Sequence, residues 1–246
     1  MPHLPHLLNL LKLRNRWLIA AGLTAGAAVA TVLVVASSNS DASTPRALTA
    51  DEANRLAITR FRNYETGGRA VRITVPDTAG ELTVTASVDF RGKRAYGVLH
   101  GAGRNSSSDG LIRWTLTQLS VVPMTDAPAT APAAPPTVGW TNRPLQASGS
   151  ALDTALRIAL GLGSDRPDNA QLLPQNGASH LGQETISGHQ TDILNGPAAR
   201  DRPDTKDTVR YWLGSDGTMY RVQAAVASEP QPVVINFDTQ QYVAPK

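Results

Sequence analysis

Few side chains in this sequence have the types and spacing that catalysis requires. The histidines that follow residue 40 are His100, His180 and His189, and the chain has no cysteine. None of them stands in the HExxH spacing with which a helix binds zinc, so no metal site is predicted. His189 and Asp192 could form an acid–base pair, but three residues apart on an expected strand they would face opposite sides. We therefore expect no catalytic residue, no metal and no cofactor, in a protein that is not an enzyme.

A glycine-rich loop, HGAGRNSSSDG at residues 100–110, has backbone N–H groups that could bind a phosphate. It lacks the GK[ST] ending of a phosphate-binding loop, and no helix clearly follows it. The sequence also lacks the G-x-S-x-G turn that presents a nucleophilic serine. The loop is therefore expected to connect two strands of a hairpin.

The remaining candidates for a binding site are apolar. Residues on the expected strands that would line a cavity for a hydrophobic ligand are Val84, Trp114, Leu116, Tyr211 and Leu213. Ligand pockets are lined mostly by such side chains, with few polar groups among them. The same side chains could instead fill the core, and composition does not separate the two alternatives.

Two helices are expected to position these strands. The first begins at a capping box, in which Thr49 and Glu52 each satisfy a free backbone N–H of the other, and Gly67 can end it by adopting a positive φ. The second begins at Ser150 and Asp153, carries an apolar stripe, and ends at the glycines that follow residue 160.

Eight segments alternate between apolar and polar residues, as strands with one buried face do. They are RAVRITV, ELTVTASVD, RAYGVLH and LIRWTLTQLSVV before the second helix, and ETISGHQTDIL, TVRYWLG, TMYRVQAAV and VVINF after it. In the fourth segment the apolar phase flips after residue 116, for which a bulge near Thr117 and Gln118 would account. The order of helix, four strands, helix, four strands predicts an α+β fold with one large antiparallel sheet packed on two helices.

A Pro/Ala-rich connector, PMTDAPATAPAAPP at residues 123–136, separates the two halves. Proline lacks a backbone donor, so this stretch cannot be a central strand. The connector could mark a domain boundary, but each half alone would have a small core. We therefore interpret it as a loop within one domain, residues 48–246.

The N-terminal region predicts a membrane anchor. Residues 17–36 contain neither charge nor proline, and twenty helical residues span a hydrocarbon core about 30 Å thick. Lys12, Arg14 and Arg16 precede this run, so residues 1–16 form a basic tail that stays in the cytoplasm. The single-pass helix would be followed by a spacer, residues 37–47, and a domain outside the cytoplasm. A cleaved signal peptide, with Ser40-Asp41-Ala42 near its site, is the alternative.

The charge distribution excludes one class of partner. The tail accounts for three of the 23 Lys and Arg residues and none of the 20 Asp and Glu, so the remainder is balanced. Phosphate backbones require a concentrated basic face. Nucleic acid is therefore not an expected partner.

Several motifs of the second half resemble a known family. They are the apolar helix ALDTALRIALGL, the pattern Gly182, Glu184, Gly188 in LGQETISGHQTDIL, and the hairpin VRYWLGSDGTMYRVQAAV. Together they resemble the actinobacterial LppX/LprG-type envelope lipoproteins, which are similar to the lipoprotein carrier LolA. The resemblance covers residues 150–246 and, more loosely, 49–122. It implies a curved antiparallel sheet wrapped around helices as a half-barrel, and binding of lipids or lipidated molecules. Unlike these lipoproteins, the chain has no lipobox cysteine.

The leading hypothesis is thus a membrane-tethered, extracytoplasmic domain that binds a hydrophobic ligand without catalysis. The alternative is an envelope protein-interaction or sensor module without a ligand cavity. A filled core together with an exposed apolar patch would favour that alternative.

Overall fold

In the computed structural model of the protein, α1 (Ala50–Glu65) begins at the capping box that the sequence predicts. Glu52 N donates to Thr49 Oγ1 at 3.3 Å, and Thr49 N donates to Glu52 Oε2 at 2.9 Å. Gly67, with φ of +84°, follows the end of the helix. The second predicted helix is α2 (Ala151–Gly161), where Ser150 Oγ accepts from Asp153 N at 3.1 Å. A short α3 (Leu172–Gln175) follows.

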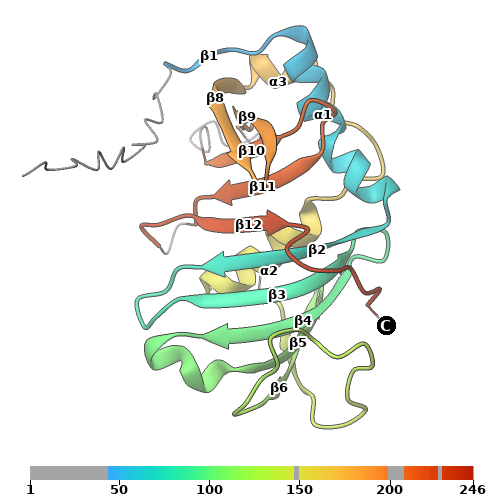
Figure 1. Ribbon diagram of the computed structural model, residues 1–246, viewed down its shortest axis with the longest axis vertical. Coiled ribbons are helices and arrows are strands. Elements are labelled where there is room, and N and C mark those ends of the chain that lie inside the picture. Colours follow the sequence, from blue (N-terminus) through green and yellow to red (C-terminus); the bar gives the residue numbers. More distant parts are fainter. Residues whose placement is uncertain (1–43, 147–149, 199–207, 227–228, 246) are drawn as a thin grey trace, which may run out of the picture. The chain divides into compact units, whose positions relative to one another are not determined.

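The structure describes residues 44–146, 150–198, 208–226 and 229–245, which belong to the unit Ser40–Lys246 (Figure 1). The predicted tail at residues 1–16 and the predicted transmembrane helix at residues 17–36 lie outside these ranges. Within them, no helix has the length and apolar character needed to cross a membrane. Two residues of the predicted spacer form β1 (Arg46–Ala47).

Twelve described strands form one antiparallel sheet, in the order β1-β8-β9-β10-β11-β12-β2-β3-β4-β5-β6-β7. The strands between β1 and α2 are β2 (Gly68–Val75), β3 (Leu82–Asp89), β4 (Arg94–Gly101), β5 (Gly110–Thr115), β6 (Gln118–Pro123) and β7 (Thr141–Pro144). The strands after α2 are β8 (Ser179–Ile186), β9 (His189–Asn195), β10 (Val209–Leu213), β11 (Met219–Ala224) and β12 (Val233–Phe237). The predicted α+β arrangement of an open, curved antiparallel sheet with helices is confirmed.

Two of the segments predicted as single strands each form a hairpin of two strands. The predicted bulge near Thr117 and Gln118 is wrong, because Trp114 in β5 pairs with Leu119 in β6 across a turn. A turn and a bulge both reverse the apolar phase, which explains the error. ETISGHQTDIL likewise divides into β8 and β9 at Ser187 and Gly188, whose φ values of +50° and +82° suit a two-residue hairpin turn.

The two halves of the chain join at β12, which lies between β11 and β2. Ile235 in β12 pairs with Val222 on one side and with Ile73 on the other. The connector joins two neighbouring strands of this sheet, because β6 and β7 on either side of it pair with each other. Both halves therefore contribute to one apolar cluster.

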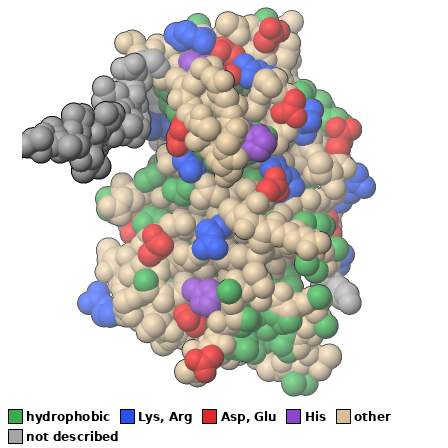
Figure 2. Space-filling view, viewed as in Figure 1, with side chains coloured by type: hydrophobic (Ala, Val, Ile, Leu, Met, Phe, Trp, Pro, Cys, Tyr) green, Lys and Arg blue, Asp and Glu red, His purple; other side chains and the backbone are tan. Residues whose placement is uncertain are grey.

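The two faces of the sheet are covered differently. The inner face packs against α1 and α2. The outer face carries a smaller cluster, in which Tyr96, Val98 and Leu111 pack against the outer loop, residues 124–140, which includes Met124 and Trp140. Hydrophobic side chains gather over this loop at the lower right of Figure 2.

Candidate functional site

Four of the five predicted lining residues lie on the inner face of the sheet. Val84 in β3 and Leu213 in β10 are fully buried, and Trp114 in β5 is 2% exposed. Tyr211 in β10 is partly buried against the same apolar cluster. Alternation along the strands places these side chains on one face.

Leu116 does not join them. β5 ends at Thr115, and Leu116 stands in the turn before β6 with 45% of its surface exposed. Its predicted place on the lining depended on extending the strand through residue 116. The hairpin turn removes that basis, so Leu116 is not part of the inner face.

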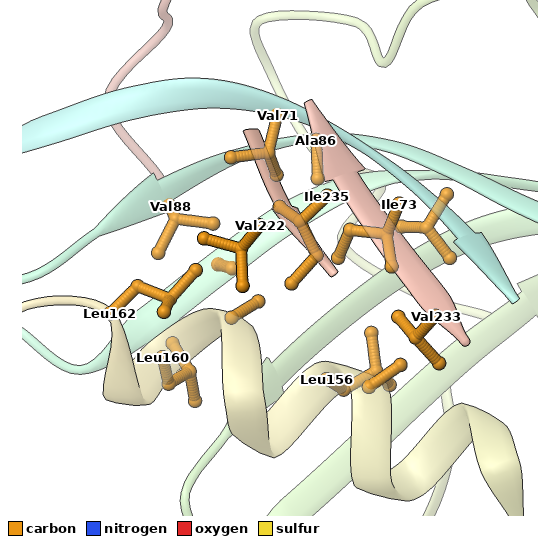
Figure 3. Close-up of a cluster of buried hydrophobic side chains, with 14 of the residues drawn as sticks. Val71, Ile73, Ala86, Val88, Leu156, Leu160, Leu162, Val222, Val233 and Ile235 are labelled. Atoms are coloured by element: carbon orange, nitrogen blue, oxygen red, sulfur yellow. The ribbon is translucent and has the colours of Figure 1, made fainter. Parts of the chain in front are cut away.

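The inner face is filled by α2 (Figure 3). Leu156 and Leu160 project from the helix toward Val71, Ile73 and Ile235 beneath the arched strands, and both leucines are fully buried. On the same face, Trp114 Nε1 donates to the backbone oxygen of Leu156 at 3.0 Å. Tryptophan therefore both packs against the helix and satisfies its polar N–H.

An ion pair fixes the N-terminal end of α2. Arg143 in β7 donates to both carboxylate oxygens of Asp153, at 2.7 and 2.5 Å, and Gln146 N donates to Asp153 at 2.9 Å. Burial raises the pKa of Asp153, but these hydrogen bonds outweigh burial, so its pKa lies below the ordinary value. The charge on Asp153 is thereby maintained although only 1% of the side chain is exposed.

A lysine fixes the C-terminal end of the same helix. Lys93 Nζ donates to the backbone oxygens of Leu160 at 3.1 Å and Gly163 at 2.6 Å. The Leu160 carbonyl is among those that a helix leaves without an internal partner at its C-terminal end. Burial lowers the pKa of Lys93. Together with Arg143, Lys93 holds α2 against the sheet at both ends.

A buried ionic cluster lies between α1 and the strands β8 and β9. His180 Nε2 is 3.3 Å from Asp192 Oδ1 and 3.8 Å from Glu52 Oε1. One ligand atom from each of these residues lies within 4.8 Å of the others, so the cluster could offer three ligands to a metal ion. Sequence spacing missed it because its members come from three elements and no local motif joins them.

Two arginines already neutralise the carboxylates of this cluster. Arg46 in β1 donates to both oxygens of Glu52, at 2.7 and 2.8 Å, and Arg55 donates to Asp192 at 2.6 Å. The hydrogen bonds from Arg46 lower the pKa of Glu52 to about 2. Burial raises the pKa of Asp192, but hydrogen bonds from Gln183 and Arg55 outweigh it and leave a net lowering. With two cations on two anions, the arrangement acts as an ionic network that ties α1 to both β1 and β9.

His189 and Asp192 do not form an acid–base pair. The ring of His189 stacks on Tyr220, with centroids 4.7 Å apart, whereas Asp192 contacts Arg55, Gln183 and His180. Three residues apart on β9, the two side chains thus lie in different environments, as expected from strand geometry.

The glycine-rich loop of residues 100–110 joins β4 to β5, which pair along their length. A 3₁₀ helix, η1 (Gly103–Ser108), lies within it. Asp109 accepts from Gly101 N at 2.7 Å and lies 3.3 Å from His100 Nδ1. The prediction of a hairpin connection is confirmed.

The described part of the chain is thus an open antiparallel sheet whose apolar inner face holds helices. No protein-family model and no curated protein matches the chain. Among solved structures, the lipoprotein LppX of Mycobacterium tuberculosis is 16% identical, with 78% of this chain and 98% of that chain covered and a TM-score of 0.40. LprF of Mycobacterium bovis is 13% identical, with 82% and 97% covered and a TM-score of 0.44. A LolA superfamily protein from Nitrosomonas europaea is 13% identical, with 81% and 96% covered and a TM-score of 0.32. All three identities are low and all three TM-scores are 0.44 or less, so no property of these proteins is carried over to this chain.

Proposed function

We propose that this chain is a non-catalytic domain that binds a hydrophobic ligand, a lipid or a lipidated molecule, between the inner face of the sheet and α2. The predicted helix at residues 17–36 would tether it to the cell membrane, with the N-terminus in the cytoplasm and the domain outside. The observation that supports the binding site is the continuous apolar face against which the eleven-residue helix α2 packs.

Because the side chains of α2 fill the space beneath the sheet, an acyl chain enters only as α2 moves outward. Apart from Asp153, the side chains that α2 buries are all aliphatic: Ala151, Ala155, Leu156, Ala159 and Leu160. Burying a leucine contributes about 1.5–3 kcal/mol, whereas each buried methylene contributes about 0.8 kcal/mol. A chain of about 14 methylenes would thus offer roughly 11 kcal/mol, which is enough to replace the contacts of two leucines and three alanines.

The direct test is native mass spectrometry of residues 41–246 purified gently from the source organism, followed by lipid extraction. This segment contains every described residue of the apolar core. The proposal expects a stoichiometric lipid, whose extraction identifies the ligand class. A clean protein mass, with no binding of a fluorescent fatty-acyl probe, would contradict it.

A second test asks whether α2 controls entry. Arg143→Gln removes the ion pair to Asp153 and should speed uptake of the acyl probe. The matched control is Arg157→Gln, which removes an equal charge from the exposed side of α2. Equal uptake rates in the two variants would contradict the proposed entry route.

The tether is tested separately in intact cells. Protease added outside should digest the domain while an N-terminal tag remains protected. Protection of the domain would contradict the proposed orientation.

The alternative function, an envelope protein-interaction module, is favoured by the core that α2 fills and by an exposed apolar patch. The outer loop, residues 124–140, exposes apolar surface, and Val138 is 77% exposed. Such a patch is typical of a contact surface. If no lipid is found, Val138→Asp should abolish crosslinking of the full-length chain to its envelope neighbour, while Thr130→Asp, an exposed control in the same loop, should retain it.

A further inference from the structure

The outer face of the sheet carries a polar groove that the proposed function does not use. Its volume is about 200 Å³, and its lining residues are Arg94, Ala95, Arg113, Trp114, Thr115, Gln118, Ser120 and Pro245. The side chains of Ala95 and Trp114 belong to the inner core, so these two residues contribute the floor. The remaining side chains on β4, β5 and β6 alternate with the core residues and therefore face outward.

Two arginines approach each other across this groove. Arg94 pairs with Thr115 and Arg113 pairs with Tyr96 in the β4–β5 register, which makes the arginines diagonal neighbours on one face. Diagonal neighbours are close enough for long side chains to reach a common ligand. No acidic side chain is among the described residues that line the groove.

The two guanidinium groups make different contacts with neighbouring side chains. Arg113 lies over the ring of Trp140, 4.2 Å from the centroid, and no described carboxylate pairs with it. A guanidinium can stack through its face while its edge still donates hydrogen bonds. Arg94 Nε donates to Asp89 at 3.2 Å, and Asp89 is also held by the backbone N–H groups of Arg91 and Gly92. This contact leaves the terminal nitrogens of Arg94 for another anion.

The C-terminal segment forms a further wall. Val243 N donates to Ser87 Oγ at 2.9 Å, which places residues 242–245 over the outer face of β3. Pro245 then reaches the groove beside hydroxyl and amide groups of Thr115, Ser120 and Gln118. The groove thus combines two cations with neutral hydrogen-bond donors.

We propose that this groove binds a phosphate group, with Arg94 and Arg113 as its charged ligands and Ser120, Thr115 and Gln118 as neutral donors. A tetrahedral anion has enough acceptor oxygens to engage both arginines and a hydroxyl at once. The phosphate could belong to free phosphate or to a phospholipid headgroup, and the chemistry that recognises it is the same. This site lies on the opposite face from the proposed hydrophobic site and does not depend on it.

The test is an NMR titration of residues 41–246 with inorganic phosphate, against chloride at the same ionic strength. We expect saturable shifts of the Arg113 Nε and the Thr115 and Ser120 amide signals. Arg113→Gln should weaken binding by about tenfold or more, the loss expected for a charge-assisted hydrogen bond. Arg113→Lys, which retains the charge, should restore part of it. Arg104→Gln removes an equal charge from η1, outside the groove, and should bind as the unaltered protein does.

A second experiment identifies the source of the phosphate. The protein is sedimented with phosphatidylglycerol vesicles and, for comparison, with vesicles of an uncharged glycolipid, and the bound fraction is measured. Binding to phosphatidylglycerol that Arg113→Gln reduces and Arg104→Gln does not supports a headgroup ligand. Phosphate binding without such vesicle binding supports free phosphate.

Absence of saturable shifts, or equal weakening in Arg113→Gln and Arg104→Gln, would overturn the proposal. Arg94→Gln provides a second variant if Arg113→Gln disturbs the contact with Trp140, and circular dichroism confirms the fold of each variant. Since lipid extraction tests the inner face and this titration tests the outer face, the two proposals fail independently.

Discussion

At the residue scale, Glu52 connects three contacts: it caps α1, pairs with Arg46, and lies beside His180. Its folded pKa of about 2 lies below the ordinary value of 4.5. A carboxylate whose pKa is lowered by folding stabilises the protein fully above its unfolded pKa. That stability is lost as the pH falls from about 4.5 toward 2.

The resulting prediction concerns Glu52→Gln. At pH 7 we expect the free energy of unfolding to fall by about 1–2 kcal/mol, through weaker capping and loss of the ion pair. Toward pH 2 the difference should disappear, because the protonated glutamate resembles glutamine. Urea unfolding at several pH values measures both. Glu65→Gln, an exposed position on the same helix, is the control and should show little difference at any pH.

The positions of the site residues could be predicted from the sequence to different degrees. Val84, Trp114 and Leu213 follow from alternation, which is a local property of a strand. Glu52 and His180 come together only through the pairing of β1 with β8 and the docking of α1, which no local pattern encodes. The groove of Arg94 and Arg113 likewise requires strand register and the path of the C-terminal segment.

At the scale of the elements, turns decide how strands are divided. The capped helices were predictable because their signals lie within a few residues. The turn after Thr115 was missed because it contains neither glycine nor asparagine. β1 and β7 were missed because they are short, exposed edge strands, whose pairing partners rather than their own composition define them.

Two glycines with similar conformations allow a matched comparison. Gly188 has φ of +82°, and no described atom would crowd an added Cβ. Gly188→Ala should therefore lower the free energy of unfolding by about 1 kcal/mol, the strain of a left-handed backbone at a residue with a Cβ. Gly217 has φ of +86°, and its Cβ would lie 3.2 Å from Ile58 and 3.3 Å from the Arg55 oxygen on α1. Gly217→Ala should therefore lower the free energy of unfolding further, by about 2 kcal/mol. Thermal unfolding measures the difference, and equal losses would mean that α1 does not restrict this turn.

The attachment of α2 is a prediction at the same scale. Arg143→Gln leaves Asp153 buried with only Ser150 and Gln146 as partners, so local opening of the helix should become easier. We expect amide hydrogen exchange across residues 151–161 to rise about tenfold, which corresponds to about 1.4 kcal/mol. In Arg157→Gln the exchange rates should stay unchanged. A rise spread over the whole domain would indicate global destabilisation instead of release of α2.

At the scale of the whole described domain, the main question is whether the two halves fold as one. The sheet passes without interruption from β11 through β12 to β2, and Val222, Ile235 and Ile73 lie in register across this junction. The packing of α2 against β2, β3 and β12 buries the same junction from the inner face. Neither half can therefore lose its structure without exposing apolar surface of the other.

This coupling predicts one cooperative unfolding transition. In residues 41–246, Trp114 and Trp140 lie before α2 and Trp212 lies after it, so Trp212→Phe and the double substitution Trp114→Phe with Trp140→Phe separate the two signals. Unfolded by urea, each variant should show the same midpoint for its fluorescence as for its circular dichroism, as cooperative unfolding requires. Ile235→Ala, which leaves a cavity at the junction, should lower the free energy of unfolding by about 2–5 kcal/mol and move both transitions together. If only the signal of Trp212 moved, the halves would be separate folding units, and the Pro/Ala-rich connector would be a domain boundary after all.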